Sequence, residues 1–93
     1  MSNLGVQQSV SAATHERLRS TLVEARKTAG LTQAELAARL ARPQSFVSKY
    51  ERGERRLDVV ELLEIASALG FDPAELIANL ANSTSATAKA RRQ

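Results

Sequence analysis

Cysteine is absent from this chain of 93 residues, and so is tryptophan. Without cysteine the chain has no disulfide framework, no thiolate zinc site and no thiol nucleophile. Only three residues are aromatic, whereas 43% of the chain is apolar and much of that share is alanine. A β-sandwich uses more valine, isoleucine and aromatic residues, so the composition favours closely packed helices. The length corresponds to one domain.

Long hydrophobic runs are missing as well. Residues 1–14 contain no Lys or Arg and no continuous apolar block, so they lack the parts of a secretory signal. No stretch reaches the ~20 apolar residues of a membrane-spanning helix. We therefore expect a soluble, cytoplasmic protein with no membrane partner, and the lack of cysteine fits this location.

Residues for catalysis or metal binding are scarce. His15 is the one histidine, and no second histidine or cysteine accompanies it. A surface role at a helix end therefore suits it better than metal ligation. The sequence has no Ser-His-Asp arrangement and no glycine-rich phosphate loop. We predict that the chain is not an enzyme and uses no cofactor and no metal.

Charge is distributed in blocks although the net charge is only +3. Residues 39–56 carry six basic and two acidic side chains, a balance of +4, whereas residues 57–82 carry five acidic side chains and no basic one. Such a contrast indicates one face for a polyanion and another kept away from it.

Three six-residue segments share one pattern: an apolar residue, Thr or Asp, two further residues, Glu and Leu. The pattern is a capping box inside a hydrophobic staple, in which the Thr or Asp accepts a first-turn amide and the Glu accepts the cap amide. Each segment therefore starts a helix. The segments are LTQAEL (31–36), LDVVEL (57–62) and FDPAEL (71–76).

Glycines at 30, 53 and 70 stand where helices end. Together with apolar spacing, these signals predict an all-α fold of five helices. Residues 1–14 are expected to form a flexible N-terminal arm, 15–82 the domain and 83–93 a flexible basic tail. The five expected helices are 15–29, 33–41, 43–52, 59–69 and 73–81.

Helices 33–41 and 43–52, joined by a tight turn, have the form of a helix-turn-helix. In the second helix, Val47 and Tyr50 are three residues apart and are expected to face the core. For Phe46 two interpretations stay open: packing under helix 33–41, or contact with a thymine methyl. The opposite face carries side chains that can bond base edges in a major groove, and these are Gln44, Ser45, Ser48 and Lys49.

The motifs LTQAELA, VSKYERGER and LLEIASALG stand in this order along the chain. In their order and spacing, residues 16–81 resemble the DNA-binding domain of the phage repressor and Cro proteins, the XRE family. The resemblance implies a compact, lambda-repressor-like five-helix domain that binds double-stranded DNA.

The resemblance also implies roles for particular residues. Gln33 matches a residue that anchors to phosphate and braces the start of the reading helix. Arg26 and Glu51 match a buried ion pair. Gln44, Ser45 and Lys49 match base-reading positions, with Ser48 beside them. We expect backbone contacts from Arg42, just before the reading helix, and from the residues that match the family's backbone-lining segment: Arg52, Arg55 and Arg56.

Three residues depart from the family pattern. Ala41 stands where the turn usually has glycine, so a left-handed conformation there would be mildly strained. Pro43 replaces the usual Ser or Thr cap of the reading helix, and Phe46 replaces a residue that is often small and polar.

The sequence thus predicts a transcriptional regulator, a homodimeric repressor that reads the major groove with helix 43–52. Helix 73–81, with Leu76, Ile77 and Leu80, is the expected dimer surface, and the alternative for the same residues is that they close the core. The alternative is an antitoxin or adaptor whose main partner is another protein, a toxin or another regulator. Duplex binding that falls as salt rises separates the two hypotheses.

Overall fold

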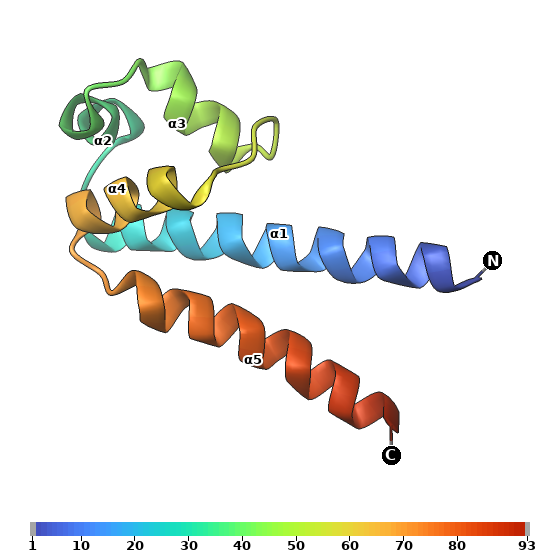
Figure 1. Cartoon of the computed structure of the whole chain (residues 1–93). Helices are drawn as coiled ribbons and strands as arrows, with labels where there is room; N and C mark the ends of the chain where they lie inside the picture. The colour runs from blue at the N-terminus through green and yellow to red at the C-terminus, as the bar shows by residue number, and fades with distance from the viewer. Residues whose placement is uncertain (1, 93) are drawn as a thin grey trace.

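Five helices account for most of the backbone in the computed structural model, which describes the backbone of residues 2–92 and the side chains of residues 11–82. The described part contains no strand. In Figure 1, α2, α3 and α4 gather at one end of α1, and α5 runs back from that end beside α1. The predicted all-α, five-helix fold is confirmed. The helices are α1 (Ser2–Thr28), α2 (Gln33–Leu40), α3 (Gln44–Glu51), α4 (Val59–Leu69) and α5 (Pro73–Arg92).

Capping boxes start α2 and α4 as the sequence predicts. Thr32 Oγ1 accepts the amide of Glu35 at 3.0 Å, and the Glu35 carboxylate accepts the amide of Thr32 at 2.8 Å. This reciprocal bonding lowers the pKa of Glu35. Asp58 and Glu61 form the same pair of bonds at 2.7 and 2.9 Å. At α5 the expectation of a capping box is wrong in part. Asp72 accepts the amide of Ala74 at 2.9 Å, but among the described residues the Glu75 carboxylate does not accept the amide of Asp72.

The core lies where α1, α2, α3 and α4 converge. Leu22, Leu36, Val47 and Ile65 are fully buried, and Tyr50 is 1% exposed. These side chains come from four helices, so burying them fixes how the helices pack. The core therefore positions α3 against the rest of the domain.

Phe46 belongs to the same core, which settles the question that its sequence position left open. Its side chain is 7% exposed, and its ring meets Tyr50 edge-on with the centroids 5.5 Å apart. An edge-to-face aromatic pair contributes ~0.5–1.5 kcal/mol beyond the area that it buries. Phe46 thus packs inward and does not stand on the exposed face of α3.

The outer helices extend beyond the predicted bounds. These helices reach into the segments expected as a flexible arm, 1–14, and a flexible tail, 83–93, since α1 begins at Ser2 and α5 ends at Arg92; the flexibility of both segments stays a prediction. Hydrophobic periodicity reports burial, and these segments lack it, yet they contain no proline that would stop a helix. Residues 1 and 93 lie outside the described residues. No helix among the described residues combines the length and hydrophobicity that crossing a bilayer requires.

The turn between α2 and α3 places a non-glycine residue in the left-handed region. Ala41 has φ 55° and ψ 43°. Its amide bonds Ala38 O at 3.1 Å, and the amide of Arg42 bonds Ala37 O at 3.0 Å, as in a Schellman motif. The motif closes α2 sharply enough for α3 to start at Gln44, but an L-residue in this conformation is strained.

Ala41→Gly is expected to raise the free energy of unfolding by ~0.5–1 kcal/mol. The left-handed conformation costs an L-residue ~1–2 kcal/mol, and the extra chain entropy of glycine offsets part of the gain. Urea unfolding followed by circular dichroism measures the change. Ala38→Gly, at an exposed position inside α2, is the control and should lose ~1 kcal/mol. Equal losses in both variants would contradict the assignment of strain to Ala41.

Candidate nucleic-acid interface

The helix α3 separates into a buried face and an exposed face. Phe46, Val47 and Tyr50 face the core. On the other side, Gln44, Ser45 and Lys49 are exposed and Ser48 is half-buried. The structure thus brings the four expected base-reading residues together on one outer face. Ser48 Oγ donates to Ser45 O at 3.3 Å, so this hydroxyl turns back along the helix.

The two residues of the expected structural ion pair lie in contact. Arg26 Nε and Nη2 donate to the Glu51 carboxylate at 2.7 and 3.1 Å, and Arg26 Nη1 donates to Leu31 O at 2.8 Å. The exposed fractions of the Arg26 and Glu51 side chains are only 12% and 6%. The hydrogen bond to Glu51 raises the pKa of Arg26. One guanidinium therefore joins α1, the turn before α2 and the end of α3.

Gln33 braces α3 at a different place from the one expected. Its side-chain amide donates to Glu51 Oε1 at 2.9 Å, so it contacts the last residue of α3 and not the first. The N-terminus of α3 begins with Pro43, which provides no side-chain cap. The buried carboxylate of Glu51 is thus the acceptor that Gln33 reaches, and the brace at the start of α3 stays a prediction.

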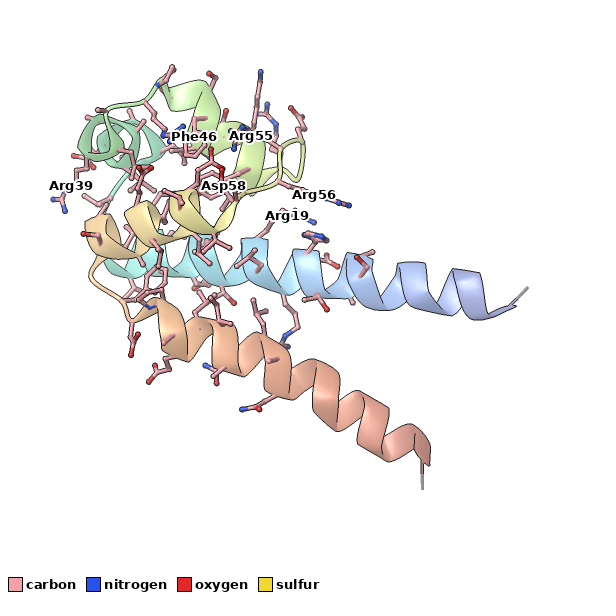
Figure 2. The ribbon with its side chains drawn as sticks, viewed as in Figure 1. Arg19, Arg39, Phe46, Arg55, Arg56 and Asp58 are labelled. Atoms are coloured by element: carbon pink, nitrogen blue, oxygen red, sulfur yellow. The ribbon has the colours of Figure 1, made fainter. Side chains whose placement is uncertain are left out.

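A second buried carboxylate, Glu61, gathers two of the arginines that we expected at the DNA backbone. Arg55 donates to both carboxylate oxygens at 2.9 and 2.7 Å, and Arg42 Nη1 lies 3.6 Å from Oε2. Both guanidinium groups also lie over the ring of Phe46, that of Arg42 at 4.5 Å and that of Arg55 at 4.8 Å from the ring centroid. Figure 2 shows Phe46 and Arg55 beside each other between α3 and α4. We call Arg42, Phe46, Arg55 and Glu61 the Glu61 cluster.

The electrostatics of the Glu61 cluster favour the ionised carboxylate. The hydrogen bonds from Arg55, followed by the amide of Asp58, lower the pKa of Glu61 to about 2, although burial acts in the opposite direction. The same hydrogen bonding raises the pKa of Arg55. The cluster therefore remains a charged network around Phe46 at neutral pH.

The remaining arginines of the loop differ in what they contact. Arg52 is exposed and bonds Glu54 at 2.9 and 3.1 Å. Arg56 is also exposed, and its guanidinium makes no hydrogen bond or ion pair with the described residues. Arg56 is thus the arginine of this loop whose charge is open to a partner.

Sequence reasoning missed two residues of this region. Glu61 was expected only as a helix cap, and no spacing rule links it to Arg55 across the loop before α4. Arg19, on α1, donates to Glu51 O at 3.4 Å and lies against Gly53. Gly53 has φ 80°, and a Cβ there would lie 3.1 Å from the Arg19 guanidinium. The basic spacing within residues 39–56 gave no signal for a contact from α1.

Two helices at a sharp turn, the second with a buried apolar face and a polar outer face, define a helix-turn-helix of the DNA-binding class. Comparisons with known proteins agree. The model of the helix-turn-helix family HTH_3 matches residues 22–76. The chain therefore belongs to the XRE family of helix-turn-helix DNA-binding transcription regulators, which is not a family of enzymes.

Individual relatives support this assignment. The chain is 41% identical over 58 residues to the uncharacterized HTH-type transcriptional regulator y4dJ of Sinorhizobium fredii (strain NBRC 101917 / NGR234). These 58 residues cover 62% of this chain and 75% of that protein. It resembles the structure of an XRE-family like protein from Pseudomonas syringae pv. tomato str. DC3000, with a TM-score of 0.81 and 48% identity over 85% of this chain and 96% of that one. For the restriction-modification controller protein C.AhdI from Aeromonas hydrophila the TM-score is 0.63, with 36% identity over 69% and 93% of the two chains.

Removing one partner of the Arg26–Glu51 pair should destabilise the fold far more than removing both. Arg26→Met leaves a buried carboxylate without its cation, and we expect a loss of ~3–5 kcal/mol in the free energy of unfolding. Arg26→Met/Glu51→Met should recover most of that loss, since apolar replacement of a buried pair is often neutral. Urea unfolding of the wild type, both single variants and the double variant measures the coupling. Additive losses would show that the pair does not act as a unit.

Stability should fall in acid because of Glu61. Its folded pKa, about 2, lies below the ordinary value of ~4.3, so between these values the unfolded chain binds the extra proton. The contribution of Glu61 is therefore present above pH ~5 and is lost as the pH falls toward 2. In Glu61→Gln this part of the pH dependence should disappear, whereas Glu64→Gln, at an exposed carboxylate that also contacts Arg42, should retain it. Urea unfolding midpoints of the wild type and both variants, compared at pH 7 and pH 3, measure this pH dependence.

Proposed function

We propose that the chain is a homodimeric transcriptional repressor of the cytoplasm that reads the major groove of DNA with α3. The observation that carries this proposal is the outer face of α3, where Gln44, Ser45 and Lys49 are exposed opposite three buried apolar side chains. A helix of this size fits the major groove, and its outward side chains then meet base edges.

The side chains of this face have the chemistry for base reading. Gln44 at the start of α3 can bond adenine through two atoms, and Lys49 can donate to the acceptors of guanine. Ser45 suits either kind of contact. Ser48, half-buried and bonded to Ser45 O, contributes a weaker contact. We therefore assign most of the sequence preference to Gln44 and Lys49.

The backbone contacts in the proposal use donors that the fold leaves free. Arg55 Nη1 donates to Arg56 O and to Glu61 Oε1, and Nη2 donates to Glu61 Oε2. Two of the five N–H groups of its guanidinium therefore remain for a phosphate. Gln33 likewise keeps its second amide proton. Arg42, Arg52 and Arg56 complete the group. Glu61 in this view holds Arg42 and Arg55 in place before DNA arrives.

The dimer surface in the proposal differs from the one that the sequence suggested. Leu76 is 7% exposed and Leu80 packs against the core, so both close the domain. Ile77 remains available at 45% exposure, together with three apolar residues of α4. Two copies joined through such exposed apolar side chains would read half-sites about one helical turn (~34 Å) apart. The exposed α4 residues are Val59, Val60 and Leu63.

Sedimentation equilibrium tests whether the chain is a dimer. A monomer at micromolar concentration, with one copy bound per duplex, would refute the proposed dimer.

The same exposed apolar residues favour the alternative function, an antitoxin or adaptor whose main partner is another protein. Val59 and Val60 are 65% and 63% exposed at the start of α4, which suits a protein contact. Selection of bound duplexes from a random-sequence pool, followed by sequencing, decides between the two functions. A selected site with two-fold symmetry supports the repressor, whereas no salt-dependent binding to any duplex supports the protein-partner function.

Gln44→Ala and Arg56→Ala should weaken DNA binding in different ways. Gln44→Ala should relax the preference at one base pair by ~1–3 kcal/mol and leave random duplexes unaffected. Arg56→Ala should weaken binding to every duplex and reduce the salt slope by about 1. Gel-shift titrations of selected and random duplexes at two salt concentrations measure both effects.

Arg56 is preferred to Arg55 for this test because Arg55→Ala would strand the buried carboxylate of Glu61 and confuse lost stability with lost contact. Arg39→Ala is the matched control, since Arg39 is an exposed arginine on α2 that the proposal does not use. If Gln44→Ala and Arg56→Ala weaken specific and random binding alike, the division of roles is wrong.

A further inference from the structure

A cavity of about 270 Å³ lies between α1 and the loop that follows α3. Burial orders its lining from floor to rim. Leu22 and Tyr50 are buried and form the floor, whereas Ala12 and Arg56 are exposed at the rim. Between them lie half-buried side chains of α1 and of the loop, which are His15, Leu18 and Leu57. The cavity is therefore apolar inside and polar at its mouth.

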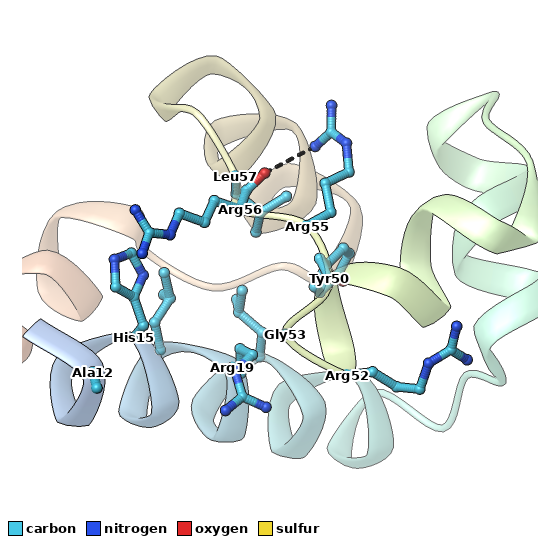
Figure 3. Close-up of a pocket in the computed structure, with 11 residues that line it drawn as sticks. Ala12, His15, Arg19, Tyr50, Arg52, Gly53, Arg55, Arg56 and Leu57 are labelled. Carbon is cyan, nitrogen blue, oxygen red and sulfur yellow. Dashed lines mark hydrogen bonds between the residues drawn. The ribbon is translucent and has the colours of Figure 1, made fainter.

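The lining is cationic, and its described residues include no carboxylate. Four arginines contribute to it, and two of these, Arg52 and Arg55, are neutralised by Glu54 and Glu61 outside the lining. Arg19 and Arg56 form no ion pair with the described residues, so two positive charges stay uncompensated. Figure 3 shows Arg56 reaching from the loop toward the ring of His15 on α1. A guanidinium and an imidazole, both able to donate hydrogen bonds, thus meet at the mouth.

The floor of the cavity contains an unmatched polar group. Tyr50 is 1% exposed, and its hydroxyl is buried without a hydrogen-bond partner among the described residues. Burial also raises the pKa of Tyr50, so the hydroxyl keeps its proton. Most buried polar groups in proteins have a partner, which makes this one an exception within the core.

We propose that this cavity binds a small organic anion with an apolar body. The charge of the ligand would lie at the mouth, on Arg56 and His15, and its apolar part would lie on Leu18, Leu22 and Leu57. The volume is slightly below the ~300–1,000 Å³ that is usual for small-molecule sites, so the ligand is smaller than a nucleotide cofactor. The absence of a carboxylate in the lining disfavours cations.

Occupation of the cavity would also weaken DNA binding, a consequence that rests on the proposed function. Arg56 is the free arginine assigned to phosphate contact, and an anion bound to it competes with the DNA backbone. By linkage, the ligand and the duplex then weaken each other by the same factor. Loss of one phosphate contact together with the new negative charge predicts about a tenfold reduction in duplex affinity.

Titration of the full chain with octanoate, followed by amide chemical shifts in NMR spectra, tests the site in the absence of DNA. Octanoate joins a carboxylate to an apolar chain, whereas acetate and 1-octanol each supply one of the two parts. We expect saturable shifts confined to residues around the cavity with octanoate, and at least tenfold weaker binding of acetate and of 1-octanol. Equal binding of octanoate and 1-octanol would overturn the anionic class, and scattered, non-saturating shifts would overturn the site.

Two variants with a control locate the ligand. Ala12→Phe adds an aromatic ring at the exposed rim without changing charge, and it should weaken octanoate binding about tenfold or more. Arg56→Gln should weaken it to a similar extent. Arg39→Gln removes the same charge from α2, outside the cavity, and should leave octanoate binding unchanged. Unchanged affinity in Ala12→Phe, with the fold intact by circular dichroism, would show that the ligand binds elsewhere.

The link to DNA is measured separately, by duplex titrations with and without saturating octanoate in the wild type and in Ala12→Phe. The expected tenfold loss of affinity should be absent in Ala12→Phe, which retains every residue proposed to bind DNA, including Arg56. If octanoate binds but duplex affinity stays constant, the regulatory consequence fails and the site stands. If no duplex binds at all, the proposed function fails, and the shifts in the free protein still decide the fate of the site.

Discussion

At the end of α3 a single carboxylate accepts hydrogen bonds from two other helices at once. Arg26 of α1 donates to Glu51 through two nitrogens, and Gln33 of α2 donates through its side-chain amide. The carboxylate is 6% exposed, so any movement of α3 that breaks these bonds leaves a buried charge unpaired. The direction in which the outer face of α3 points is therefore set from within the domain, before any contact with DNA.

The Glu61 cluster secures the other side of α3. The guanidinium groups of Arg42 and Arg55 both lie over the ring of Phe46, and Glu61 of α4 holds both groups. Phe46 departs from the small polar residue that the family often has, and the cluster gives the physical reason why an aromatic side chain is accommodated there. Its ring faces buried neighbours and cations, so the departure strengthens the packing of α3 and leaves its outer face free.

The sequence alone was sufficient for the helices whose starts depend on local chemistry. Thr32 and Asp58 form their capping boxes because the partners lie three residues away, a distance that the sequence displays. The contact of Arg26 with Glu51, 25 residues apart, was reached only through the resemblance to a family. The Glu61 cluster and the contact of Arg19 with the end of α3 could not be predicted, because both depend on how the loop after α3 folds back. The outer turns of α1 and α5 lie beyond the expected bounds because their sequences show no apolar periodicity from which a helix could be predicted.

The block pattern of charge also changes its meaning once the chain is folded. In sequence, the basic segment 39–56 and the acidic segment 57–82 are separate, which suggested two separate faces. In space, Glu61 and Glu64 of α4 return to Arg42 and Arg55 and neutralise part of the basic segment. The charge that a polyanion meets is thus smaller than the sequence sum and concentrated on fewer side chains. Arg56 beside the cavity has no acidic partner among the described residues, and Lys49 on the face of α3 feels only the charge of Glu54, so in the proposed complex attraction to DNA depends on these two side chains more than on the number of arginines.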